Sequence, residues 1–308
     1  MNPPFRVGTR GSPLALAQTQ EVVDRLLAVQ PDVRTETVVI RTQGDESYRE
    51  DLGTALDRKR AFTKRLEEAL LDDRIDFAVH SLKDLPTETV EGVVIAAIPP
   101  RGDPRDAFVG REHLTLEDLG PGVRVGTSSL RRRAQLLSRW PDLEVRELHG
   151  NVGTRLGRLD TRDFDAVVVA AAGLGRLRVE DRRVTPLPPE IMTPAPGQGA
   201  LAVQARTGDR PVLELLSSID HPSTRRTTQA ERALSARFGV GCNVPFGALA
   251  TAEGGISLRA VVADREGRRV VRAEEQAVAS QWDRVVESVW MKLVEGGGDE
   301  LVTEEASP

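Results

Sequence analysis

The sequence predicts an α/β fold made of two similar units in tandem, followed by a smaller C-terminal part. The main evidence is an internal repeat, because Arg-Val-Gly-Thr at 6–9 returns at 124–127. Each copy reads as a strand, a Gly-Thr turn and then a helix. A second repeat relates 76–80 to 165–169, where an acidic residue opens an apolar strand. Two such units would face each other across a cleft, with ligands at the carboxyl ends of their strands.

The first unit shows clear helix signals. Ser12 is a suitable N-cap and Pro13 a suitable first helical residue, and Pro31 stops this helix after about Val29. The polar, irregular stretch 42–60 is expected to form a mobile loop. The expected strands are 5–10, 33–41, 75–80 and 93–98, and the expected second helix is 62–71.

Proline-rich segments at 99–104 and 186–196 indicate where the chain crosses between units. We therefore expect three domains, with boundaries at 1–99 and 197–218, at 104–194, and at 219–308. In the third domain we expect a helix at 224–238, a hairpin of 256–264 and 268–274, and a helix at 281–294.

Composition restricts the partners. The net charge is -5 and aromatic residues make up 4% of the chain, which argues against nucleic acid as a partner. No apolar run reaches the roughly 20 residues of a membrane span, and the first residues lack a signal-peptide pattern. A single cysteine fits a reducing cytoplasm. Only four of the 42 basic residues are lysines, namely Lys59, Lys64, Lys83 and Lys292.

The single cysteine, Cys242, lies in a stretch that favours chemistry over packing. A small buried apolar residue is the simpler interpretation of a lone cysteine. However, Gly239 and Gly241 remove side chains from the approach to the sulfur, and Pro245 and Gly247 are expected to fix a rigid turn after it. We interpret Cys242 as a reactive or covalently loaded position.

The turn after the first strand of each unit is a candidate anion site. Helix N-termini present unpaired N–H groups and the positive end of the helix dipole. Any one arginine could belong to a solvated surface, but the repeated strand–turn–helix context favours ligand contact for Arg10, Arg131 and Arg132. Guanidinium groups grip carboxylates in a bidentate manner, so the ligand is expected to carry several carboxylates or phosphates.

Lys83 and Asp84 are adjacent in the loop after the strand 75–80. Lys83 can bind an anion while Asp84 points elsewhere. Asp84 could merely form an Asx-turn before Pro86. In a cleft lined with arginines it is the candidate proton-handling carboxylate.

Five segments in order resemble the porphobilinogen deaminase family. They are 79–86, 125–132, 150–155, 196–199 and 231–245. The resemblance runs from about Arg6 to the C-terminal hairpin. It implies two domains like those of periplasmic binding proteins, facing a cleft, and a small α/β C-terminal domain that carries the cysteine.

The resemblance also implies the activity. The family is a transferase, hydroxymethylbilane synthase, which joins four porphobilinogen molecules head to tail with loss of ammonia, in tetrapyrrole biosynthesis. Its cofactor is a dipyrromethane attached by a thioether to the cysteine matching Cys242. Asp84 would lie against the pyrrole nitrogens and stabilise the positive charge of the azafulvene left when ammonia departs. A cytoplasmic monomer without a metal, and with porphobilinogen as its small-molecule partner, is expected.

The remaining roles follow by similarity. The resemblance assigns cofactor contacts to Ser81, Lys83, Thr127, Ser129, Arg131, Arg132 and Asn151. It assigns substrate contacts to Arg10, Ser12, Gln18, Phe62, His149, Arg155, Arg176 and Gln198.

Three residues depart from the family pattern. His149 stands where the family usually has arginine, which makes that contact weaker or pH-dependent. Arg60 replaces a glycine of a loop, and Val240 replaces the first of two glycines before the cysteine. A family member impaired by these changes is one alternative. A solute-binding module without chemistry is another, and Cys242 counts against it.

Overall fold

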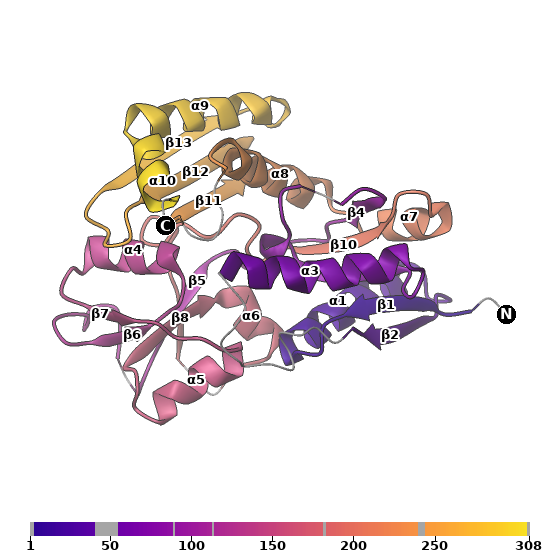
Figure 1. Cartoon of the computed structure of the whole chain (residues 1–308), viewed down its shortest axis with the longest axis horizontal. Helices are drawn as coiled ribbons and strands as arrows, with labels where there is room; N and C mark the ends of the chain where they lie inside the picture. Colours follow the sequence, from indigo (N-terminus) through magenta and orange to yellow (C-terminus); the bar gives the residue numbers. More distant parts are fainter. Residues whose placement is uncertain are drawn as a thin grey trace. The chain divides into compact units, whose positions relative to one another are not determined.

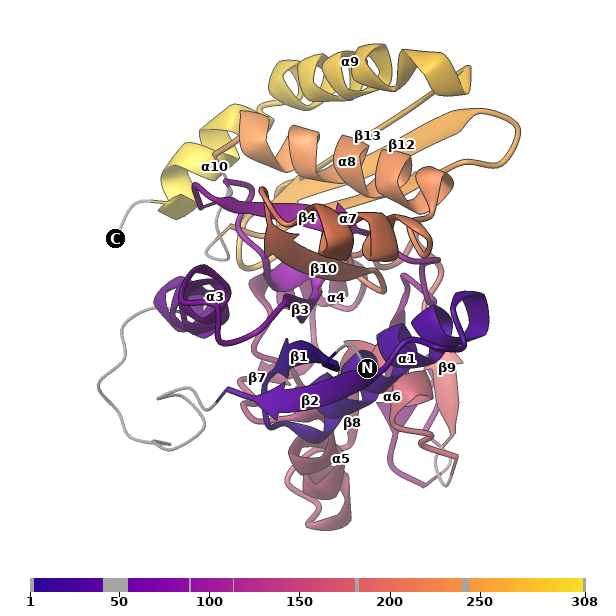
Figure 2. The same cartoon turned by 90° about the vertical axis from the view of Figure 1, so that its right-hand side faces the viewer.

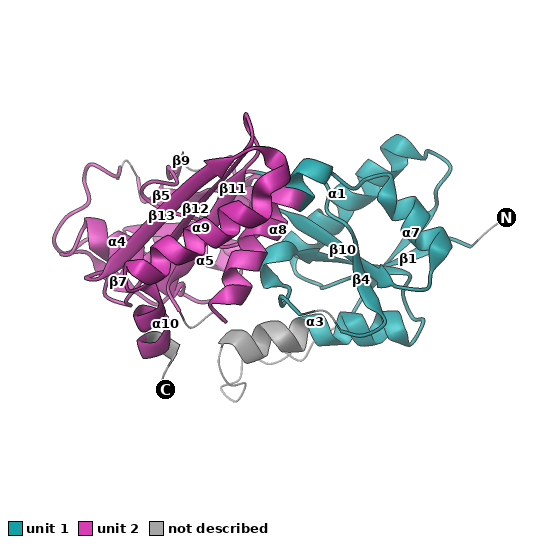
Figure 3. Cartoon of the chain, turned by 90° about the horizontal axis from the view of Figure 1, so that it is seen from above, with its two compact units in different colours: residues 1–102, 200–225 teal, residues 103–199, 226–308 magenta. Residues whose placement is uncertain are grey.

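The computed structural model describes residues 3–40, 55–88, 90–112, 114–180, 183–239 and 244–306, with side chains 55–62, 305 and 306 outside the description. The chain divides into two compact units (Figure 3). Unit 1 comprises residues 1–102 and 200–225, and unit 2 comprises residues 103–199 and 226–308. The division into three domains stays a prediction.

Unit 1 is built on a five-stranded mixed sheet with the order β2-β1-β3-β10-β4. The inner strands β1 and β3 run parallel, and β10 is antiparallel to both of its neighbours. Val7, Phe77 and Val203 pack on α1 and α7 on one face, while Ala78 packs on α3 on the other. The strands are β1 (Phe5–Thr9), β2 (Thr35–Val39), β3 (Phe77–Ser81), β4 (Val93–Ala97) and β10 (Leu201–Arg206), and the helices are α1 (Pro13–Val29), α3 (Ala55–Leu71) and α7 (Arg210–Ser217).

Unit 2 repeats this topology with the order β7-β6-β8-β5-β9. Here β6 and β8 run parallel and β5 is antiparallel to both neighbours. Figure 1 shows α4 and α5 on opposite sides of the sheet, where Phe108 and Val168 face α4 and Ala107 and Val167 face α5. The strands are β5 (Asp106–Gly110), β6 (Arg124–Gly126), β7 (Glu144–Arg146), β8 (Ala166–Ala170) and β9 (Val184–Pro186), and the helices are α4 (Leu130–Arg139), α5 (Val152–Asp160) and α6 (Ala171–Arg176).

The C-terminal part of unit 2 is a three-stranded antiparallel sheet with the order β11-β12-β13. Figure 2 shows α9 lying along β12 and β13, and Val285, Val289 and Leu293 of this helix are buried in the same core as Leu258 and Ala260. The elements are α8 (Pro222–Arg237), β11 (Phe246–Thr251), β12 (Ile256–Ala263), β13 (Val270–Ala277), α9 (Trp282–Glu295) and α10 (Gly298–Ala306).

The predicted α/β class with a small C-terminal sheet is confirmed, and the structure corrects two details. Residues 55–60, expected in a loop, belong to α3, whereas 42–54 lie outside the described residues. Gly247 lies inside β11 rather than in a turn. A Cβ there would lie 2.7 Å from the carbonyl oxygen of Thr193, so glycine allows this strand to approach the neighbouring backbone. No described helix could span a membrane.

Candidate active site

In unit 1, a short turn after β3 carries three of the predicted residues. Ser81 ends the strand, and the 3₁₀ turn Leu82–Asp84 follows it. Leu82 is fully buried and its N–H donates to Ala200 O at 3.0 Å, while the N–H of Leu85 donates to Leu82 O at 3.1 Å. These contacts anchor the turn on both sides, so Lys83 and Asp84 are held half-buried at the carboxyl end of β3.

Helix α1 approaches this turn. Gln18 is 7% exposed, and its Nε2 donates to Ser81 Oγ at 2.7 Å. Ser12 caps the helix, because its Oγ accepts from Ala15 N at 3.3 Å. The structure therefore brings Gln18 and Ser81 together and leaves Ser12 at the N-terminus of α1.

His80, which the sequence analysis did not single out, lies among these groups. The pKa of its imidazole is lowered to about 4, chiefly by burial; Asp84 acts to raise it and Arg10 to lower it. Arg10 and Asp84 thus both lie within electrostatic reach of one buried imidazole. The signal that could have found His80 is its place in a strand that is buried on both faces.

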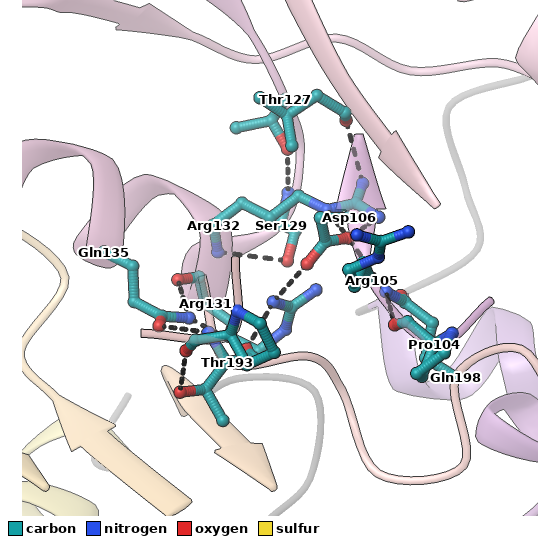
Figure 4. A network of polar contacts seen from close by, with 12 residues as sticks. Pro104, Arg105, Asp106, Thr127, Ser129, Arg131, Arg132, Gln135, Thr193 and Gln198 are labelled. Atoms are coloured by element: carbon teal, nitrogen blue, oxygen red, sulfur yellow. Dashed lines mark hydrogen bonds and ion pairs between the residues drawn. The ribbon is translucent and has the colours of Figure 1, made fainter. Parts of the chain in front are cut away.

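In unit 2, the equivalent turn follows β6 and opens α4. Ser129 is the N-cap, since its Oγ accepts from Arg132 N at 3.4 Å. Its own N–H donates to Thr127 Oγ1 at 3.2 Å. The two arginines of the first turn, Arg131 and Arg132, are each only 5% exposed (Figure 4).

Asp106 lies between these arginines and was missed by the sequence analysis. Its carboxylate is fully buried and forms ion pairs of 2.7 Å with both Arg131 Nη1 and Arg132 Nη2. Burial alone would raise the pKa of Asp106, but the two guanidinium groups hold it well below its ordinary value. Asp106 is the first residue of an apolar strand, and the repeated Asp76 and Asp165 each lie one residue before such a strand. This shared pattern is the sequence signal that could have identified Asp106.

Three other predicted residues lie at the ends of helices α5 and α6. Asn151 caps α5, and its Oδ1 accepts from Thr154 N at 2.9 Å. Arg155 Nε donates to Gly150 O at 2.9 Å, and Arg176 Nη2 donates to Gly199 O at 3.0 Å.

His149 is exposed, with its Nε2 lying 3.1 Å from Glu147 Oε2. Gln198, by contrast, is 1% exposed and points at Asp106.

Several predicted positions cannot be placed. Cys242 and Val240 lie outside the described residues. Arg60 and Phe62 belong to α3, but their side chains are outside the description. Gly239, just before this stretch, adopts a φ of 59°, a left-handed conformation that glycine tolerates. Among the described acidic, histidine and cysteine side chains, no cluster is able to hold a metal ion.

The arrangement defines a class of protein: two α/β units of the same topology, each presenting a helix N-terminus and cationic side chains suited to a ligand with several carboxylates. The model of the porphobilinogen deaminase dipyrromethane cofactor-binding domain matches residues 5–214, and the model of that enzyme's C-terminal domain matches residues 226–289. The chain belongs to the porphobilinogen deaminase family.

Relatives of nearly full length agree. The chain is 44% identical over 300 residues to the porphobilinogen deaminase of Thermus thermophilus, covering 97% of this chain and 98% of that one. It is 47% identical over 297 residues to that of Desulforudis audaxviator, covering 96% of each. A solved structure of the substrate binding protein of an amino acid ABC transporter is similar with a TM-score of 0.38 and 14% identity, covering 77% of this chain and 100% of that one.

The family membership confirms the predicted activity. The chain is a hydroxymethylbilane synthase, a transferase of tetrapyrrole biosynthesis that uses porphobilinogen, and its larger matched region is a dipyrromethane cofactor-binding domain.

Proposed function

We propose that Arg131 and Arg132 hold carboxylates of the dipyrromethane cofactor, that Cys242 is its point of attachment, and that Asp84 handles charge and protons at the reacting pyrrole. When bound, the cofactor supplies the free pyrrole α-carbon to which the first of four porphobilinogen molecules is joined. The observation that carries this proposal is the buried cluster of two arginines on one aspartate.

The donor set in unit 2 fits such a ligand. Each pyrrole of the cofactor carries an acetate and a propionate, so binding requires several cationic or N–H donors. Two guanidinium groups opposite one carboxylate leave one positive charge uncompensated, and a buried charge without a counter-ion is costly. Ser129, Thr127 and Asn151 add hydroxyl and amide groups at helix N-termini, where anions are favoured.

In unit 1, the anchored turn suits Asp84 to catalysis. Positive charge develops on porphobilinogen as ammonia leaves, and a carboxylate held in place stabilises that charge without having to reorganise. Joining the α-carbon then releases a proton, which Asp84 is suited to accept. Lys83, on the same turn, offers its ammonium to a pyrrole carboxylate, as does the neighbouring Ser81 through its hydroxyl.

The predicted substrate contacts are proposals of the same kind. Arg10 and Gln18 of unit 1 lie near the turn that carries Asp84, as the electrostatic partners of His80 and the hydrogen bond to Ser81 indicate. Ser12, the N-cap of α1, is proposed as a further substrate contact. For unit 2 and α3 we propose substrate contacts by His149, Arg155, Arg176, Gln198 and Phe62.

We also propose a cytoplasmic monomer. A reducing compartment keeps the sulfur of a single cysteine available for a thioether. Gel filtration of the purified chain against protein standards tests the oligomeric state, and elution at twice the monomer mass would contradict the proposal.

Intact-protein mass spectrometry tests the attachment. The purified chain should be heavier than its sequence by two pyrrole units, and the increment should map to the peptide that contains Cys242. The Cys242→Ser variant, which keeps the shape but lacks the nucleophilic sulfur, should have the bare sequence mass and no turnover. A bare mass for the unaltered chain that porphobilinogen leaves unchanged, as expected for a solute-binding module, would overturn the proposal.

A further inference from the structure

Asp106 binds both arginines through separate oxygens. Its Oδ2 accepts from Arg131 Nη1 at 2.7 Å, and its Oδ1 accepts from Arg132 Nε at 2.9 Å (Figure 4). Gln198 Nε2 donates to the same Oδ1 at 3.0 Å and to Pro104 O at 2.9 Å. The carboxylate is therefore held from three sides by groups of the chain itself.

The backbone fixes the guanidinium groups as well. Arg131 Nη1 also donates to Thr193 O at 2.8 Å, and Arg132 Nη1 donates to Val168 O at 3.0 Å. Arg131 makes all of these contacts through Nη1. Within the described part of the chain, its Nε and Nη2 have no hydrogen-bond partner, so one edge of this guanidinium is left for a carboxylate.

The position in the sheet is that of a ligand site. Asp106 pairs with Ala170, the last residue of β8, and the Thr127–Ser129 turn follows the end of β6. The cluster thus lies at the carboxyl ends of the parallel strands, where ligands bind in open α/β sheets. The nearby Arg105 is paired with Asp103 at 2.7 Å, so the excess of one positive charge belongs to Arg131 and Arg132.

We propose that Asp106 is the resident counter-ion and positioning residue of the cofactor site. It holds Arg131 and Arg132 in their binding geometry before the cofactor is attached, and it leaves one positive charge for a carboxylate of the incoming dipyrromethane. The inference rests on the proposed function of the two arginines. Such preorganisation lowers the cost of ordering flexible side chains during binding.

Unit 2 provides a matched control. Asp165 also binds two arginines, Arg124 at 2.9 Å and Arg111 at 3.1 Å. This cluster lies at the opposite edge of the sheet, because Asp165 precedes β8 and its N–H donates to Arg124 O. It is also partly exposed, with arginine side chains 28–29% accessible. The Asp165 cluster therefore has the same charges as the Asp106 cluster, but it does not lie at the carboxyl ends of the parallel strands.

The experiment compares cofactor-free and loaded protein of the same sequence. Cofactor-free chain is produced in cells that make no porphobilinogen, and loading is followed by intact mass after porphobilinogen is added. Asp106→Asn should slow loading about tenfold, because the two arginines are no longer held in place. This change in rate corresponds to about 1.4 kcal/mol of lost preorganisation. It should also lower the thermal midpoint more in the cofactor-free form than in the loaded form, because the cofactor's carboxylate then supplies the missing charge.

Asp165→Asn should lower the thermal midpoint equally in both forms and leave loading unchanged. Equal loss in both forms for Asp106→Asn, with loading as in the unaltered chain, would show a merely structural ion pair and overturn the inference. Asp106→Glu serves if the asparagine variant does not fold, because it keeps the charge but places the carboxylate on a longer side chain. This variant should load more slowly than the unaltered chain, and loading at the unaltered rate would overturn the positioning role of Asp106. Failure of the unaltered chain to gain mass would instead refute the proposed function.

Discussion

Glu231 accepts a hydrogen bond of 2.6 Å from the backbone N–H of Gly197. Its other carboxylate oxygen accepts a 2.8 Å bond from the N–H of Ala250 in β11. One fully buried carboxylate of α8 therefore holds both the turn before Gln198 and the C-terminal sheet. Since Gln198 holds Asp106, a continuous set of hydrogen bonds joins α8 to the arginine pair.

The first prediction concerns this carboxylate. In Glu231→Gln the side chain keeps one acceptor oxygen, so one of the two N–H groups would face an amide nitrogen and stay unpaired. A buried unpaired polar group costs about 1–3 kcal/mol, and urea unfolding at neutral pH should show a loss of that size. Glu266→Gln removes an exposed carboxylate bonded to Arg133 and should cost less than about 0.5 kcal/mol. Equal losses in the two variants would contradict the role of Glu231.

The second prediction concerns Asp84. Asp84→Asn keeps the shape of the side chain and removes its negative charge, so kcat should fall by about a hundredfold or more. The cofactor should still be present in the mass spectrum, because attachment occurs once per molecule and a slow reaction still completes during expression. Glu88→Gln, an exposed change on the same loop, should leave kcat nearly unaltered. A loss of only a few-fold for Asp84→Asn would refute its catalytic role.

The third prediction is a pH dependence of stability. The pKa of buried His80 is lowered to about 4, chiefly by burial. Asp84 and Gln204 act to raise this pKa and Arg10 acts to lower it, and Gln204 also donates a hydrogen bond to Glu67. Between about pH 6.5 and 4 the unfolded chain binds a proton that the folded chain does not. Stability present above pH 6.5 is therefore lost as pH falls towards 4.

His80→Gln removes this titration. Between pH 7 and pH 5 the free energy of unfolding of the variant should fall by about 2 kcal/mol less than that of the unaltered chain. Urea unfolding at the two pH values, with the cofactor content checked by mass, provides the measurement. Parallel pH curves for the two proteins would contradict the lowered pKa, because they would show that His80 binds its proton equally well in the folded and the unfolded chain.

The fold was largely predictable where the signals are local. The Gly-Thr repeat identified β1 and β6, and Ser12 was correctly predicted as an N-cap, with Ser129 capping the equivalent helix. Strands β5 and β10 were not predicted, and each pairs antiparallel with strands distant in the sequence. Their apolar residues carry no local sign of which partner they join.

The site was predictable to the same extent. Arginines at helix N-termini point to an anion, and on that ground the sequence predicted Arg131 and Arg132, which the structure places in the first turn of α4. Their contact with a ligand stays a prediction. Asp106 was missed because its partners come from other elements, and only folding brings a strand-opening aspartate against the first turn of α4. The sequence also gave no indication that Gln198, expected to contact substrate, directs its amide at this carboxylate.

The last prediction concerns the departure at His149. This side chain is 59% exposed and lies beside Glu147, so its contact with a substrate carboxylate is expected to be weak and screened. A guanidinium stays charged at all working pH values and can bind a carboxylate through two N–H groups, whereas an imidazole is charged only in acid. His149→Arg should therefore lower KM for porphobilinogen by about two- to fivefold at alkaline pH and less at acidic pH. Comparison of KM for both proteins between pH 6 and pH 9 provides the test. A KM ratio that stays at unity throughout would show that the side chain at position 149 does not contact the substrate.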